Sequence, residues 1–260
     1  MMLAAHVVIS PQTIALLGLA AGMAGLIDSI AGGGGLITTP ALLAAGLPPL
    51  NALATNKLQS VFSQMMSTWR YAGRGLIDFR GYVPTALAIF CASAVGTLTV
   101  QHVATGTLRR LIPLLVIAAM LYMLLSPRMT DAESAPRVGR VGYAPVATAI
   151  GFYDGFFGPG TGSFFTTSLV GLRGMGVIRA AAHTKLFNFA SNAGSLTIFL
   201  LSGQAIWLIG FTMAVCAMAG AWIGAHVAMR HGARVIRPLL IAASLALTAK
   251  LIWDGFFAGR

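Results

Sequence analysis

Two short stretches interrupt the apolar sequence of this chain and decide its fold: LIDSIAGGGGLITTP at residues 26–40 and FYDGFFGPGTGSFFTT at residues 152–167. In each stretch an acid, Asp28 or Asp154, ends a hydrophobic segment, and a glycine cluster follows four residues later. Carboxylates and glycine clusters are costly inside a bilayer unless they face protein or water. The duplicated pair therefore predicts a site at which broken helices from two halves of a membrane protein meet near the membrane midplane.

The composition indicates that lipid surrounds most of the chain. Of its 260 residues, 57% are apolar and only 9% are charged, whereas a soluble domain carries roughly a quarter charged residues. Apolar runs of near-spanning length cover residues 13–31, 82–100, 111–125, 205–227 and 239–253, and two less uniform runs cover 52–71 and 180–201. These runs predict an all-α polytopic membrane protein with no room for a soluble domain.

The net charge of +11 does not indicate nucleic-acid binding, because the arginines cluster in short loops, as expected for cytoplasmic loops of a membrane protein. Cys91 and Cys216 both lie within apolar segments and have no metal-ligand spacing. We therefore expect no metal and no other cofactor. The sequence also has no Walker-type phosphate-binding motif, so we do not expect the chain to hydrolyse ATP.

The two halves of the chain align with each other. Asp28 with Asp154, Lys57 with Lys185, Cys91 with Cys216 and Pro113 with Pro238 are four matched anchors in one order, at offsets of 125 to 128 residues. This pattern predicts an N-terminal repeat over residues 1–128, a cytoplasmic linker over 129–140 and a C-terminal repeat over 141–260.

The charges of the loops predict that the repeats are inverted. Residues 173–179 and 230–237 of the second half are basic, and 201–204 between them are uncharged. In the first half the order is opposite, because residues 46–51 are uncharged and 70–80 are basic. If basic loops are cytoplasmic, equivalent loops lie on opposite sides of the membrane. Arg109 and Arg110 are an exception, since they fall on the external side.

An inverted repeat requires an odd number of crossings in each half. Each half offers three full spans after its glycine cluster, so the region before them must enter and leave on one face. We therefore expect re-entrant helical hairpins at residues 13–43 and 142–172 that turn at the glycines, although the segment 13–31 is long enough to span.

The short helix after each glycine cluster starts with unpaired backbone N–H groups, which can bind an anion. Nearby hydroxyl, amide and ammonium groups would add donors. The predicted substrate-binding residues are Gly33, Gly34, Gly35, Thr38, Asn56, Lys57, Gly160, Thr161, Gly162, Ser163, Thr184, Lys185 and Asn188. The alternative is that the glycines serve helix packing alone.

A polar stripe follows each hairpin at spacing i, i+3, i+7, i+10, which places its members on one helical face. The stripes are Lys57, Ser60, Gln64 and Ser67, and Lys185, Asn188, Asn192 and Ser195. We expect Ser60, Gln64, Asn192 and Ser195 to line a pathway, with interhelical hydrogen bonding as the alternative. The two lysines either snorkel to the surface, pair with the acids, or attract an anion. Asp28 and Asp154 either carry coupled protons or have a structural role.

The segments GLIDSIAGGGGLITTPALLAAGLPPLNALATNKL and GFYDGFFGPGTGSFFTTSLVGLRGMGVIRAAAHTKLFNF resemble the signature of the TauE/SafE family of membrane permeases. The likeness covers both halves, although Thr184 stands where the first copy has Asn56. The resemblance implies a multi-pass carrier of the bacterial inner membrane for small sulfur-containing or organic anions, such as sulfite or sulfoacetate.

The leading hypothesis is a secondary transporter, not an enzyme, that works by alternating access around a midplane site. Its expected partners are a small anion, the lipid bilayer and a coupled proton or other ion; nucleic acid is not expected, and a homo-oligomer is left open. The alternatives are a passive anion channel and an intramembrane aspartyl enzyme that uses Asp28 and Asp154 as its carboxylates.

Overall fold

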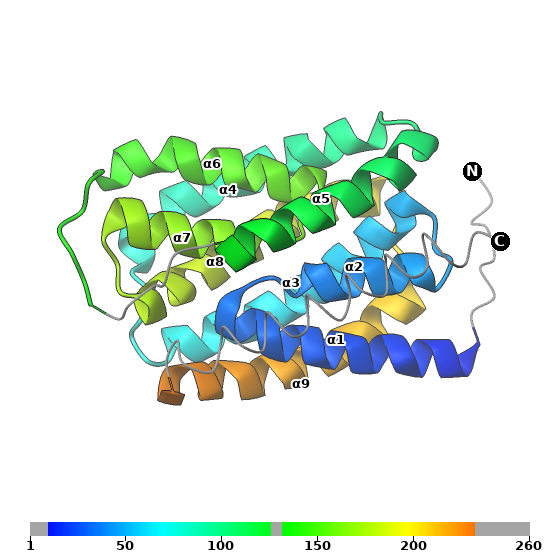
Figure 1. The fold of residues 1–260 in the computed structure, drawn as a ribbon, viewed down its shortest axis with the longest axis horizontal. Coiled ribbons are helices and arrows are strands. Elements are labelled where there is room, and N and C mark those ends of the chain that lie inside the picture. Colours follow the sequence, from blue (N-terminus) through cyan, green and yellow to red (C-terminus); the bar gives the residue numbers. More distant parts are fainter. Residues whose placement is uncertain (1–9, 126–131, 232–260) are drawn as a thin grey trace.

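The computed structural model describes residues 10–125 and 132–231, which form helices joined by turns and short connecting segments, with no strand in these ranges (Figure 1). The helices are α1 (Pro11–Ala31), α2 (Gly35–Ala44), α3 (Pro49–Ala72), α4 (Phe79–Gln101), α5 (Thr105–Leu125), α6 (Arg140–Phe156), α7 (Thr161–Arg173), α8 (Val177–Leu201) and α9 (Trp207–His231). The predicted all-α class is confirmed. The expected span at 239–253, the anchor Pro238, residues 232–237 of the basic loop and residues 126–131 before and within the linker lie outside the described residues.

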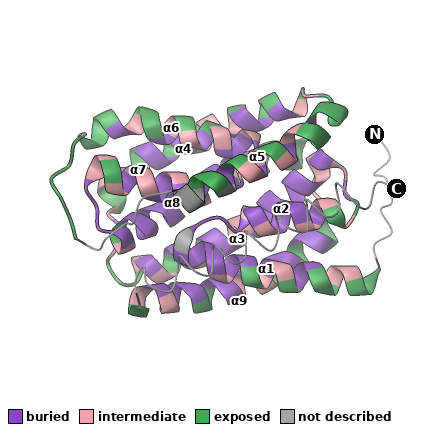
Figure 2. Cartoon of the chain, viewed as in Figure 1, coloured by how far each residue is buried: buried purple, intermediate pink, exposed green. Residues whose placement is uncertain are grey.

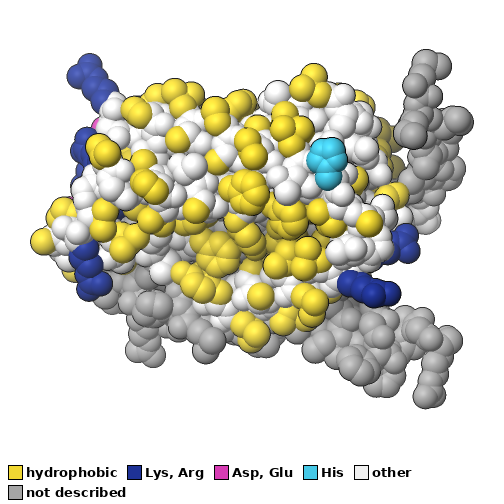
Figure 3. Space-filling view, turned by 90° about the horizontal axis from the view of Figure 1, so that it is seen from above, with side chains coloured by type: hydrophobic (Ala, Val, Ile, Leu, Met, Phe, Trp, Pro, Cys, Tyr) yellow, Lys and Arg dark blue, Asp and Glu magenta, His cyan; other side chains and the backbone are white. Residues whose placement is uncertain are grey.

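The exterior of the bundle suits a lipid environment. Among the described residues, three helices are long and apolar enough to cross a membrane: Pro11–Ile30, Phe79–Gln101 and Trp207–His231. Large apolar side chains on these helices face outward, including Leu19 at 67% and Leu208 at 69% exposure. Figure 3 shows apolar side chains spread over one face, with the Lys and Arg side chains at its two ends. An apolar middle between charged ends is typical of a membrane protein.

Both predicted hairpins break at their glycines. Helix α1 ends before Gly32, which has φ 77°, and α7 begins after Gly160, which has φ 89°. A residue with a Cβ is strained at these left-handed angles. The second arms, α2 and α7, have 10 and 13 residues. They are too short to cross a hydrocarbon layer of about 30 Å at about 1.5 Å per residue.

Apart from the two glycine turns, the connecting segments gather at two ends of the bundle, which we call the Pro48 end and the Asp78 end. At the Pro48 end, the Asn51 side chain donates to the Gln204 carbonyl (2.8 Å), so α3 begins where α8 ends. At the Asp78 end, Asp78 pairs with Arg140 at the start of α6 (2.8 Å). The Gly81 amide that Asp78 caps, together with Arg140, holds the pKa of the Asp78 carboxyl below its usual range against the opposing effect of desolvation.

The first helices of the hairpins start at opposite ends. Helix α1 runs alongside α9 in the same direction, since Gly18 lies against Cys216 and Leu26 against Gly220 and Gly224. Helix α6 runs alongside α4 in the same way, because successive glycines on these two helices meet carbonyls of the other. Since α9 starts at the Pro48 end and α4 at the Asp78 end, α1 and α6 enter the bundle from opposite ends (Figure 1).

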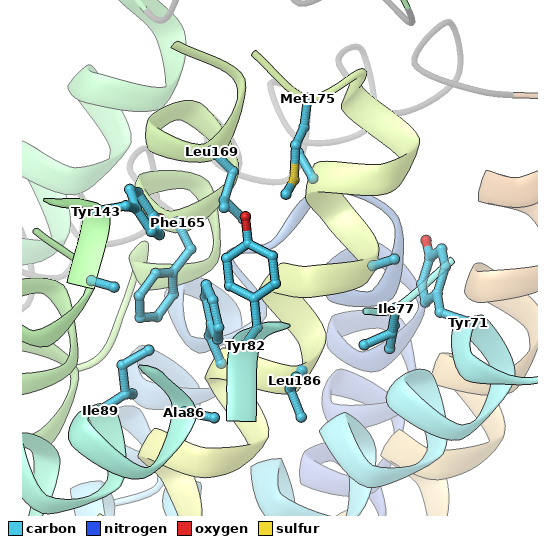
Figure 4. Packing of buried hydrophobic residues seen from close by; sticks show 14 of the residues in the cluster. Tyr71, Ile77, Tyr82, Ala86, Ile89, Tyr143, Phe165, Leu169, Met175 and Leu186 are labelled. Atoms are coloured by element: carbon cyan, nitrogen blue, oxygen red, sulfur yellow. The ribbon is translucent and has the colours of Figure 1, made fainter. Parts of the chain in front are cut away.

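Helices α3 and α8 form the centre of the bundle and are buried along most of their length (Figure 2). Near the Asp78 end they pack into an aromatic cluster in which Tyr82, Tyr143 and Phe165 are fully or almost fully buried (Figure 4). A second apolar cluster, which includes Leu53 and Phe199, draws on α2, α3, α4, α5 and α8. The polar stripes of α3 and α8 are therefore held inside an apolar framework.

Candidate functional site

Two buried ion pairs connect the halves of the chain, and each joins a lysine of one half to the acid of the other. Lys57 on α3 lies 2.9 Å from the Oδ1 atom of Asp154 on α6. Lys185 on α8 lies 3.4 Å from the Oδ2 atom of Asp28 on α1. The lysines are only 2% and 1% exposed, so the snorkelling alternative is wrong for both. Pairing with the acids, one of the predicted alternatives, is what the structure contains.

Each ammonium also reaches the end of the helix that carries its acid. Lys57 Nζ donates to the backbone carbonyl of Asp154 (2.6 Å), and Lys185 Nζ donates to that of Asp28. The last carbonyls of a helix carry the negative end of the helix dipole. The Asp28 carbonyl also accepts from the backbone amide of Gly32 (2.8 Å). The cation therefore satisfies a side chain and a broken helix end together, which explains why a lysine is tolerated at this depth.

The side-chain carboxylate of Asp28 lies at the start of α2, the short helix of its own hairpin. Its Oδ1 atom accepts hydrogen bonds from the amides of Gly33 and Gly34, both at 2.9 Å. Its Oδ2 atom accepts one from the Gln64 side chain on α3. These two amides were predicted to bind a substrate anion, and in this structure a carboxylate of the protein is bound to them.

Asp154 is held in a different way. Its Oδ1 atom accepts from the Thr161 hydroxyl (3.0 Å), and its Oδ2 atom accepts from the Ser191 hydroxyl on α8. Hydroxyls thus replace the backbone amides that hold Asp28. The two halves are alike in which charges they pair but differ in the neutral donors around each acid.

The tips of the two hairpins touch through backbone. A Cβ at Gly32 would lie 2.8 Å from the α-carbon of Gly162, and a Cβ at Gly162 would lie 2.7 Å from the α-carbon of Gly32. Real Cβ atoms essentially never show such distances. Glycine at both positions allows the close approach of the two broken helices, as small residues do between membrane helices generally.

A cavity of about 40 Å³ lies beside this contact. It is lined by residues of α1, both hairpin turns, the starts of α2 and α7, and the polar faces of α3 and α8. Twelve of the predicted binding and pathway residues line it: Gly33, Gly34, Gly35, Asn56, Lys57, Ser60, Gln64, Gly160, Thr161, Gly162, Asn188 and Asn192, together with the acids Asp28 and Asp154. About 10–15 Å³ of such volume holds one water, so the cavity has room for a small ion.

The other predicted site residues lie behind the cavity wall. Thr38 donates to the Asn56 side chain (2.5 Å), and Thr184 shares a 3.0 Å hydrogen bond with Thr166. Each hydrogen bond fastens the short arm of a hairpin to the helix that follows it. Ser195 shares a 2.7 Å hydrogen bond with Ser93, so it joins α8 to α4 instead of lining the cavity. Ser163 and Lys185 are buried but are also outside the lining.

Sequence reasoning missed several polar residues of the site. Gln59 and Ser63 line the cavity, and Ser191 holds Asp154. Asn56, Gln59 and Ser63 follow the spacing i, i+3, i+7, so they form a second polar row one residue ahead of the predicted α3 stripe. A search for two adjacent polar rows on this helix, not one, would have found Gln59 and Ser63.

The site does not have the features of a metal centre or an aspartyl enzyme. Within residues 10–125 and 132–231, no group of three or more His, Cys, Asp or Glu residues could hold a metal ion. An aspartyl dyad places two carboxylates where they share a proton. Here Asp28 and Asp154 each face a lysine.

An apolar exterior, two broken hairpins that meet at their tips, and buried charges around a small polar cavity define a helical membrane protein of the transporter type. The sequence profile of the family Sulfite exporter TauE/SafE matches residues 17–251. The chain therefore belongs to this family and is a membrane transporter.

Curated relatives agree with this assignment. The chain is 45% identical to "Probable membrane transporter protein ORF9" of Sinorhizobium sp, over 93% of both chains. It is 41% identical to "Probable membrane transporter protein YfcA" of Escherichia coli (strain K12), over 95% of this chain and 92% of the relative. It is 40% identical to a "Probable membrane transporter protein" of Haemophilus influenzae, over 90% and 93% respectively. No solved structure matches the chain.

Proposed function

We propose that the chain is a secondary carrier for small anions, with sulfur-containing oxyanions or organosulfonates such as sulfite or sulfoacetate as its substrates. The observation that carries the proposal is that each half supplies the lysine that pairs with the acid of the other half, Lys57 with Asp154 and Lys185 with Asp28. The name of the matched family, Sulfite exporter TauE/SafE, supports the substrate class. We place the carrier in the bacterial inner membrane, in line with its bacterial relatives.

The two acids act as internal substitutes for the substrate. The Asp28 carboxylate is bound to two amides at a broken helix, which is a common way to bind an anion. An incoming anion competes for these amides and for the lysines. Protonation of an acid weakens its hold on the lysine and the amides, so anion binding and proton uptake favour each other. This gives Asp28 and Asp154 the role of coupling acids.

Alternating access follows from two inverted repeats. The entry of α1 and α6 from opposite ends supports the inversion, as does the similar packing of α1 on α9 and of α6 on α4. Each of these two ion pairs joins helices of different halves, so a movement of one half against the other changes the distances in both pairs together. The site then opens to one side of the membrane at a time.

The test is anion counterflow in proteoliposomes that contain the purified protein. Sulfite, thiosulfate, sulfate, sulfoacetate and acetate are compared as internal anions that drive uptake of a labelled external anion. A carrier gives saturable uptake that depends on the internal anion, with the sulfur-containing anions most effective. Uptake that never saturates indicates a channel, and no anion-dependent uptake refutes the proposed function.

A further inference from the structure

The last part of the linker between the halves, residues 132–139, lies at the Asp78 end of the bundle. It forms no helix or strand, yet its backbone is bound to the turn between α7 and α8. The Ser134 amide donates to the Gly174 carbonyl (2.8 Å), and the Val138 amide donates to the Leu172 carbonyl (3.0 Å). We call residues 132–139 the strap. Because its backbone groups have partners on another element, the strap has a fixed place on this turn.

Side chains fasten the strap as well. Arg173, at the end of α7, donates from Nη1 to the Val138 carbonyl and from Nε to the Tyr82 hydroxyl on α4 (3.0 Å). Glu133 of the strap pairs with Arg179 near the start of α8 (3.0 Å), although an exposed pair of this kind contributes little by itself. Arg173 therefore joins the strap to α4, a helix of the first half.

Beside the strap, the start of α4 is bound to the second half at two more points. The Asp78 carboxylate pairs with Arg140 (2.8 Å), whose guanidinium lies over the Tyr82 ring at 5.6 Å. The Asp78 backbone amide donates to His183 Nε2 on α8 (3.1 Å). The strap, α4, α6, α7 and α8 thus form one connected polar layer that closes this end of the bundle.

The equivalent turn of the first half has no such cover among the described residues. Gly174 follows Gly46 by 128 positions, the same offset that relates the two buried lysines. Both glycines have a positive φ, 65° and 88° respectively. A Cβ at Gly174 would lie 2.2 Å from the Ser134 carbonyl oxygen, whereas a Cβ at Gly46 would meet no atom within 4 Å. The strap therefore covers one of two turns that are otherwise alike.

The strap is bound but hardly buried. All of residues 132–139 are exposed except Val138, which is half-buried. A segment with few buried apolar contacts and exposed backbone hydrogen bonds opens locally at a small fraction of the cost of global unfolding. The strap can therefore leave the turn while α7 and α8 stay folded.

We propose that the strap is a gate: it holds the Asp78 end closed, and it leaves the α7–α8 turn whenever the central cavity opens to that side. The basic loops 70–80 and 173–179 assign this side to the cytoplasm. The inference rests on the proposed alternating access, in which α4 of one half separates from α6, α7 and α8 of the other. Since Arg173 bridges α4 and the strap, that separation weakens the hold on the strap.

The first test fixes the strap to the turn. Val138→Cys/Leu172→Cys joins two residues whose backbones share a hydrogen bond, in a Cys91→Ala/Cys216→Ala background. The disulfide is formed with copper phenanthroline, its yield is measured by mass spectrometry, and anion counterflow is measured in proteoliposomes. Oxidation should lower counterflow at least about tenfold, and a reducing agent should restore it, because a gate that stays closed stops the cycle. Each single-cysteine variant, treated in the same way, should keep its rate.

The second test frees the strap and needs no substrate. Ser60→Cys, in the same background, places a thiol in the cavity lining. A small charged methanethiosulfonate reagent is added from the cytoplasmic side of inside-out vesicles. Gly174→Ala puts a methyl group where the Ser134 carbonyl lies, so the thiol should react at least about fivefold faster. Gly46→Ala carries the same strain of a positive φ but meets no atom, so the thiol should react at the parent rate.

The outcomes separate this inference from the proposed function. Full counterflow by completely crosslinked protein overturns the gate and leaves the carrier intact. Equal labelling in the Gly174→Ala and Gly46→Ala variants also overturns the gate. Faster labelling in Gly174→Ala, together with no anion transport by wild type, supports the gate while the proposed anion transport fails. Since each test uses its own variants, one remains decisive if a variant of the other does not fold or its cysteines do not join.

Discussion

Lys57 and Asp154 are 97 positions apart in the chain, yet the ammonium of one lies 2.9 Å from the carboxylate of the other, inside the bundle and between its two halves. Removal of one partner from a buried pair leaves an uncompensated charge, which costs about 3–5 kcal/mol. Lys57→Ala should therefore lower the free energy of unfolding in mixed micelles by about this amount. Transport in proteoliposomes should be lost as well.

The double variant Lys57→Met/Asp154→Asn separates stability from transport. It removes both charges, so most of the lost stability should return while transport stays absent. Transport by the double variant would show that the pair has only a structural role. The control Arg140→Ala removes the half-exposed partner of Asp78. Because exposed pairs contribute little, this control should keep wild-type transport.

The role of the two acids in proton coupling can be tested with asparagine, which has nearly the same shape as aspartate. In Asp28→Asn and Asp154→Asn the new side chain still accepts hydrogen bonds but takes up no proton in the transport range. We expect each variant to lose uptake driven by a pH gradient and to retain exchange of internal for external anion. Both fluxes are measured in the same proteoliposomes, with and without the gradient. Wild-type accumulation by both variants would remove proton coupling from the account.

The contact between the hairpin tips predicts different effects for two glycines of the same helix. In Gly162→Ala the new methyl group would meet the backbone of Gly32, whereas a Cβ at Gly171 has no atom within 4 Å. Overpacking costs about 1–3 kcal/mol, so Gly162→Ala should lower thermal stability and slow anion exchange. Gly171→Ala should behave as wild type. Equal rates in the two variants would show that the tips do not need to touch.

The fold was largely predictable because its signals are local. Apolar runs gave the helices, and the glycine clusters after Asp28 and Asp154 gave the breaks between α1 and α2 and between α6 and α7. Helix boundaries differ from the predicted ones where polar residues extend a helix beyond its apolar run. Helix α5 begins at Thr105, six residues before the predicted run, because polar residues such as Arg109 and Arg110 continue the helix.

The site was predictable only in part, because its partners are distant in sequence. Residue type and spacing identified the acids, the lysines and the glycines, but they did not determine which lysine meets which acid. That choice depends on how α3 and α8 cross between the hairpins. The same limit applies to Ser195, whose spacing fits the pathway stripe but whose hydrogen bond goes to Ser93 on α4.

The central claim is that the two halves insert in opposite directions, so that each lysine meets the acid of the other half. The most direct measurement is the sidedness of single cysteines at the exposed ends of α2 and α7. These are Ala44→Cys and Gly171→Cys, each made in a background in which Cys91 and Cys216 are alanine. With a membrane-impermeant maleimide on oriented vesicles, the account predicts that position 44 reacts from outside and position 171 from the cytoplasmic side. Reaction of both positions from one and the same side would contradict it.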